Sequence, residues 1–160
     1  MSRGPSDQDQ TRPGGGEVDP TLILPGSGQG RAASQDGAPE SRSMEMLALI
    51  RKDQKRFSEA ERMMRETLEL RRRLLGPNHP DTANAKYDLA CILALAGKRP
   101  AALELIRDSI EHGLNAASAG TIGEDSDFAP LHGDPRFTQL VADGKRIAAD
   151  AAANRTSGAQ

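Results

Sequence analysis

The sequence LALI at residues 47–50 returns, with one change, as LACI at residues 89–92. The same shift of 42 residues places Ala60 on Ala102 and Arg65 on Arg107. These matches fall mainly on small or apolar positions, which stacked helix pairs need where their backbones approach closely. The repeat therefore predicts an all-α fold that contains two antiparallel helix hairpins.

Clusters of glycine and proline separate the segments that have helical periodicity. These segments predict helices at about residues 43–55, 58–75, 81–97 and 100–112. Ser58, three residues before Glu61, is the expected N-cap of the second helix. Asp134 before Pro135 predicts the beginning of a further helix, which would cap the two hairpins.

Composition divides the chain into three parts. Residues 1–40 are rich in glycine, proline and serine and are predicted to form a disordered arm. Residues 41–150 are predicted to form the helical domain, with units at about 43–80 and 81–114 and a capping segment at 126–150. Residues 151–160 are predicted to be a flexible tail.

Net charge, the length of apolar stretches and cysteine content indicate which classes of protein the chain can belong to. A formal net charge of -2 gives no indication of a nucleic-acid partner. The longest apolar stretch is much shorter than the roughly 20 residues that a membrane-spanning helix needs. The single cysteine, Cys91, and the polar N-terminal sequence favour a reducing, cytoplasmic location.

No pattern of residues indicates catalysis, a cofactor or a metal site. The three histidines are far apart in the sequence, and Cys91 has no partner at metal-binding spacing. Phosphate-binding, hydrolase and metalloprotease motifs are absent from the sequence. We therefore expect a protein that is not an enzyme and that binds neither metal nor cofactor.

Two charged clusters are interpreted as solvated surface. Arg71, Arg72 and Arg73 follow Glu66 and Glu69 by about one helical turn, so ion pairs along one exposed helix face are expected. The acidic residues at positions 124, 125 and 127 lack the remaining ligands of a calcium loop and are expected to form an exposed loop before a helix.

The segment LLGPNHPDTA at residues 74–83 resembles the linker of the kinesin light chain type of tetratricopeptide repeat. Leu89 and Ala90, followed by Leu93, Ala102 and Ile106, are similar to the order of small and large apolar positions in that family. The sequences YDLACILALAG and DFAPLHGDPRFTQLV resemble the closing unit of bacterial tetratricopeptide arrays, some of which are attached to Ser/Thr kinases. The resemblance implies a scaffold or adaptor that binds a peptide or a partner helix.

In such repeats the first helix of each unit lines a concave face. The candidate contacts with a protein partner are therefore Arg42, Glu45, Leu49, Lys52, Asn84, Tyr87, Asp88 and Cys91. Residues 44–50 are apolar nearly all round the first helix, so this helix is expected to pair with a partner helix or with a second copy of the chain. The alternatives are thus a self-assembling homodimer module and a regulatory fragment of a larger bacterial signalling protein.

Overall fold

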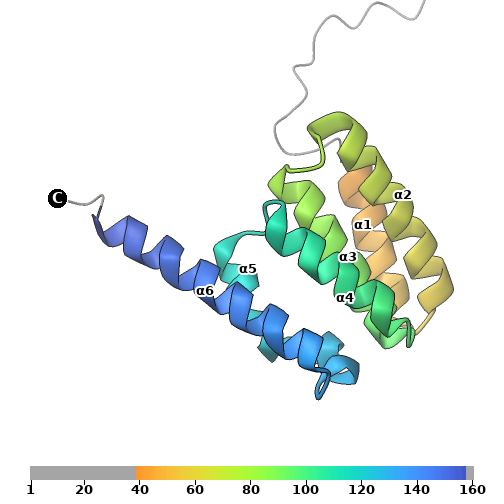
Figure 1. Ribbon diagram of the computed structural model, residues 1–160. Coiled ribbons are helices and arrows are strands. Elements are labelled where there is room, and N and C mark those ends of the chain that lie inside the picture. Colours follow the sequence, from red (N-terminus) through yellow and green to blue (C-terminus); the bar gives the residue numbers. More distant parts are fainter. Residues whose placement is uncertain (1–38, 158–160) are drawn as a thin grey trace, which may run out of the picture. The chain divides into compact units, whose positions relative to one another are not determined.

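The computed structural model describes residues 39–157, and every regular element in that range is helical. The order along the chain is α1 Pro39–Asp53, α2 Phe57–Leu75, α3 Pro80–Leu95, α4 Arg99–Glu111, α5 Ala116–Thr121, η2 Ile122–Glu124, η3 Ser126–Leu131 and α6 Pro135–Ser157. Helices α1 and α2 form one hairpin and α3 and α4 another, and Figure 1 shows the two hairpins side by side. The predicted all-α architecture, with two hairpins and a C-terminal helix, is confirmed.

Small residues at equivalent positions allow the hairpins to pack closely. Ala60 of α2 and Ala102 of α4 are both fully buried, as are Leu89 and Ile92 of α3. Helix α3 is the centre of the core because it packs against both α2 and α4. Its neighbours on either side leave little of its surface exposed, which explains why its sequence is apolar over most of its length.

Ala102→Leu is expected to destabilise the protein by about 1–3 kcal/mol, because the larger side chain has no space among the buried residues around it. Ala60→Leu should have an effect of similar size, since this residue occupies the equivalent position of the other hairpin. Urea unfolding followed by circular dichroism measures both, with the exposed Ala101→Leu as the control. Equal midpoints for all three variants and the wild type would contradict the repeat alignment.

Helix termini agree with the sequence in some places and differ in others. Helix α3 begins after His79, whose Nδ1 accepts a hydrogen bond from the Asp81 amide. Helix α6 begins at Pro135, and the Asp134 side chain accepts a hydrogen bond from the Arg136 amide, which confirms the predicted N-cap. Ser58 is not an N-cap: α2 already begins at Phe57, and the preceding residue makes no side-chain capping bond.

The ends of the described region also differ from expectation. The predicted disordered arm lies outside the described residues except for Pro39 and Glu40, which form the first turn of α1. At the other end, α6 continues to Ser157, well into the segment predicted to be a flexible tail. Alanine-rich sequence favours this extension, because alanine has the highest intrinsic helix propensity. Residues 158–160 lie outside the described region.

The C-terminal elements α5, η2, η3 and α6, which we call the capping unit, pack together beside the hairpins. Helix α5 lies against α6, where the backbone carbonyl of Ala119 approaches Gly144 so closely that a Cβ atom there would be only 2.1 Å from its oxygen. The short helix η3 packs on α3, and α6 makes a smaller contact with α4. The capping unit is therefore attached to the repeats mainly through η3.

Candidate functional site

A groove of about 350 Å³ lies between α1 and α3, on the face predicted to be concave. Its lining includes four of the predicted contact residues, namely Arg42, Glu45, Leu49 and Asn84, together with Met46, Arg71 and Asp81. The side chain of Asn84 forms no hydrogen bond with residues 39–157. This part of the face, which we call the open groove, thus combines apolar surface with an amide that can donate and accept hydrogen bonds.

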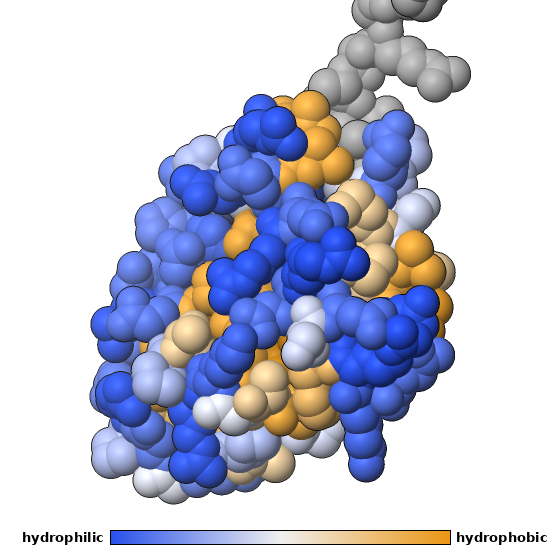
Figure 2. Space-filling model, turned by 90° about the vertical axis from the view of Figure 1, so that its right-hand side faces the viewer, coloured by the Kyte–Doolittle hydropathy of each residue, from blue (hydrophilic) through white to orange (hydrophobic). Residues whose placement is uncertain are grey.

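Beside the open groove, α1 presents large apolar side chains to solvent. Met46 is 66% exposed, Leu47 46% and Ile50 44%, and Leu74 near the end of α2 is exposed as well. Figure 2, which views the molecule from the side of α2, shows hydrophobic patches between hydrophilic residues. Ala48, on the opposite side of α1, is fully buried. Only one face of α1 is therefore covered by its own hairpin.

The remaining predicted contacts are not on an open surface. Residues 125–131 lie across this part of α3, so that Tyr87 donates a hydrogen bond of 2.7 Å from its hydroxyl to Asp125. Lys52 of α1 forms a hydrogen-bonded ion pair with Asp127. Cys91 is buried beneath the same segment. We call this part of the concave face the closed groove.

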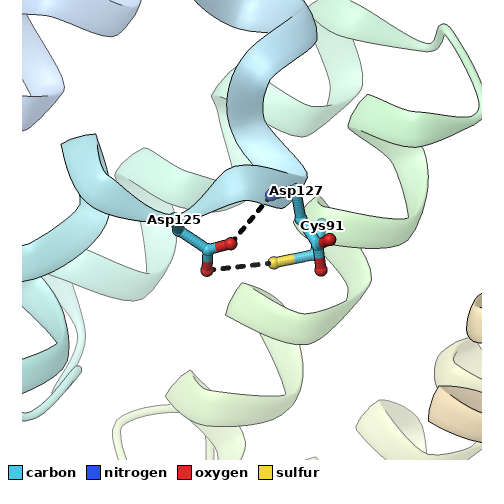
Figure 3. A group of neighbouring side chains, drawn as sticks. All are labelled: Cys91, Asp125 and Asp127. Atoms are coloured by element: carbon cyan, nitrogen blue, oxygen red, sulfur yellow. Dashed lines mark hydrogen bonds between the residues drawn. The ribbon is translucent and has the colours of Figure 1, made fainter.

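The acidic segment is thus not the solvated loop expected from sequence. Figure 3 shows the Asp125 carboxylate pointing toward the thiol of Cys91, with the other oxygen of Asp125 accepting a hydrogen bond from the Asp127 amide at 2.9 Å. Cys91, Asp125 and Asp127 offer three potential ligand atoms within 4.8 Å of one another. The carboxylates of Asp125 and Asp127, however, already accept hydrogen bonds from Tyr87 and Lys52. Hydrogen bonding and ion pairing therefore account for this cluster.

Burial keeps the Cys91 thiol and the Tyr87 hydroxyl protonated. Burial raises the pKa of Cys91 well above its ordinary value, and the negative charges of nearby Asp125 and Asp88 raise it further. Burial also raises the pKa of the Tyr87 hydroxyl, and the hydrogen bond to Asp125 raises it further. A thiol that stays neutral is a poor nucleophile. Cys91 consequently acts as a small, weakly hydrogen-bonding core residue.

Arg71 is the main departure from the predicted charge pattern. It was expected on a solvated face, yet it is only 3% exposed. Its guanidinium donates to both carboxylate oxygens of Glu45, at 2.7 and 2.8 Å, and to the carbonyl of Asp81 at 3.1 Å. Arg71 therefore links α2 to α1 and to the first turn of α3. Arg72, by contrast, is exposed and lies 4.0 Å from Glu69 as expected.

Asp88 lies beside the ion pair of Arg71 and Glu45 and interacts with both charges. Burial raises the pKa of Asp88 to about 7, the charge of Glu45 and a hydrogen bond to it act in the same direction, and Arg71 and Lys52 oppose the shift. The carboxyl group therefore holds its proton to a much higher pH than an ordinary aspartate does. As an isolated aspartate in the unfolded chain, it would lose its proton near pH 4.

Asp88→Asn is expected to flatten the pH dependence of stability. Between about pH 4 and 7 the folded protein holds a proton on Asp88 that the unfolded chain has lost, so the free energy of unfolding falls as pH rises. Asparagine mimics the protonated form and removes this contribution. Urea unfolding at pH 4.5 and 7.5 should show a change between the two pH values that differs from the wild type by at least about 1 kcal/mol. Parallel pH profiles would show that Asp88 is ionised in the folded state.

A larger groove of about 590 Å³ lies between α4 and α6 and was not predicted. Its lining includes apolar Ile110, Leu140 and Ile147 and three arginines. The sequence gives no signal for it, because it depends on how α6 lies against α4.

The two hairpins are the part of the chain that matches a known protein family. Residues 40–112, which span α1 to α4, match the family model described as tetratricopeptide repeat. The two hairpins are tetratricopeptide-type repeats. No curated protein and no solved structure matches the chain. Tetratricopeptide repeats generally mediate protein–protein interactions. None of the helices within residues 39–157 is both long and apolar enough to span a bilayer.

Proposed function

We propose that the chain is a non-catalytic scaffold or adaptor that binds a peptide or a partner helix at the open groove. The exposure of Met46 beside a groove lined by both tetratricopeptide-type repeats carries the proposal. Fully burying a side chain of this size contributes about 1.5–3 kcal/mol to binding. Asn84 supplies a directional hydrogen bond, so that the site combines an apolar anchor with a polar contact.

The finer features of the proposal rest on sequence. The linker at residues 74–83 supports the kinesin light chain type of repeat, and the closing segment supports a relation to bacterial arrays. The single cysteine, Cys91, supports a reducing, cytoplasmic location. On this basis the chain is either a free adaptor or a regulatory fragment of a larger bacterial signalling protein.

Affinity purification with mass spectrometry tests partner binding. The wild-type chain is compared with Met46→Glu, which places a charge at the open groove, and with Lys145→Glu on the exposed side of α6 as the control. Met46→Glu should lose a protein that the wild type and the control both recover. Recovery of the same proteins by all three chains would exclude the open groove as the partner-binding site. Lys52 and Tyr87 are unsuitable for this test, because both hold the closed groove together.

Self-association is a second candidate, and a comparison within the chain favours it. The 42-residue shift places exposed Leu47 on buried Leu89 and exposed Ile50 on buried Ile92. In the second repeat these positions are covered by neighbouring helices, whereas in the first they face solvent. A homodimer would cover them. Sedimentation over a wide concentration range should then show a dimer that Leu47→Glu with Ile50→Glu dissociates, and a strictly monomeric wild type would exclude this candidate.

A further inference from the structure

The closed groove is covered by a short segment of the chain itself, residues 125–128. Asp125 accepts the Tyr87 hydroxyl bond, and Asp127 pairs with Lys52. The ring of Phe128 is fully buried and meets Tyr87 edge-to-face, with 5.3 Å between ring centroids. Two carboxylates and one aromatic ring, within four consecutive residues, therefore make the contacts on this part of the face.

The groove residues that receive the segment come from both repeats. Lys52 lies near the end of α1, whereas Tyr87 and Cys91 lie one turn apart on α3. In each polar contact with these residues the repeats supply the donor and the segment supplies the acceptor. Burial acts to lower the pKa of Lys52, but the hydrogen bond and charge of Asp127 outweigh it, so that the net shift is upward. The site thus favours an anion at this position.

We propose that residues 125–128 are an internal ligand of the concave face, and that the closed groove recognises peptides of the pattern Asp-x-Asp-Phe. This inference rests on the proposed function, because it assigns a ligand class to another part of the same face. A tethered segment acts at an effective concentration on the order of millimolar. It therefore keeps external peptides out of the closed groove and leaves the open groove as the accessible part of the face.

Binding of a peptide from outside tests this proposal. The probe is a fluorescently labelled peptide of residues 123–133, GEDSDFAPLHG, whose anisotropy is followed during titration with the full-length chain. In the double variant Asp127→Asn with Phe128→Ala, the internal segment loses its ion pair and its ring. The peptide should bind this variant about tenfold or more tightly than the wild type. Loss of one charge-assisted contact weakens the hold of the internal segment on the closed groove by about that factor.

Two further variants make the result decisive. Lys52→Glu, added to the double variant, should abolish binding of the peptide, and a peptide carrying Asp127→Lys should restore it. If circular dichroism shows that the double variant has lost its helices, Asp125→Asn with Asp127→Asn replaces it, because this pair leaves the buried ring in place. A smaller rise in affinity is then expected in the same direction.

Equal binding to the wild type and to the folded variant would overturn the internal-ligand proposal, and so would binding that Lys52→Glu does not change. Met46→Glu separates this proposal from the proposed function. Loss of peptide binding with Met46→Glu but not with Lys52→Glu would place the peptide in the open groove, which leaves the proposed function intact and excludes the internal ligand. If Lys52→Glu abolishes peptide binding while Met46→Glu leaves partner recovery unchanged, the internal ligand is supported and partner binding at the open groove is excluded.

Discussion

Arg71→Met is expected to destabilise the protein by about 3–5 kcal/mol, although the new side chain is apolar and of similar length. The guanidinium holds both oxygens of Glu45 and the Asp81 carbonyl in a site where Arg71 is almost fully buried. Removing it leaves the Glu45 carboxylate without its cation, next to Asp88. Urea unfolding monitored by circular dichroism measures the loss.

Arg72→Met is the matched control, because Arg72 is the next residue in α2 and lies exposed. A surface ion pair of this kind contributes about 0–1 kcal/mol, so little change is expected. Similar unfolding midpoints for the two variants would show that Arg71 is solvated in solution and that the network with Glu45 does not form.

Phe128→Ala is expected to cost about 3–5 kcal/mol as well, because the ring is fully buried between two other aromatic rings. It contacts Tyr87 of α3 at 5.3 Å and Phe137 of α6 at 5.7 Å between centroids. Its loss should therefore weaken the attachment of the capping unit to the repeats. Amide hydrogen exchange should show faster exchange in α5 and the first turns of α6, with smaller changes in α2.

The control for this prediction is Phe57→Ala, in which a partly exposed phenylalanine at the beginning of α2 is removed. Its effect should be clearly smaller. Uniform acceleration of exchange through all helices after Phe128→Ala would contradict the view that the capping unit is attached mainly through η3.

The two hairpins could be predicted because their signals are local. Apolar residues at helical spacing, the glycine and proline clusters between them, and the return of LALI as LACI all specify helix pairs without reference to distant residues. Asp134 and Pro135 specify the beginning of α6 in the same way.

The closed groove could not be predicted, because it depends on contacts between distant segments. Residues 116–131 contain glycine, serine and aspartate with no helical periodicity, and nothing in them indicates that Asp127 meets Lys52 across 75 positions of sequence. Four of the eight candidate contact residues do line the open groove. That they bind a partner stays a prediction.

Arg71 could have been placed correctly from its helical phase. Ala60, Met64, Thr67 and Arg71 follow one another at spacings of four, three and four, which puts them on one side of α2, and all four are buried. The run of three arginines suggested a solvated face, but only one of the three lies on the packing side. Its burial requires a carboxylate, which Glu45 supplies from a helix that the sequence alone does not place.

Site-specific photo-crosslinking in cells tests most directly whether the open groove binds a protein partner. A photoreactive amino acid replaces Asn84 in the full-length chain, and a second chain carries it at Lys145 as the control. The prediction is a discrete crosslinked product from position 84 that is absent from position 145 and that disappears when Met46→Glu is added. The same products from both positions, or a product that Met46→Glu leaves unchanged, would contradict partner binding at the open groove.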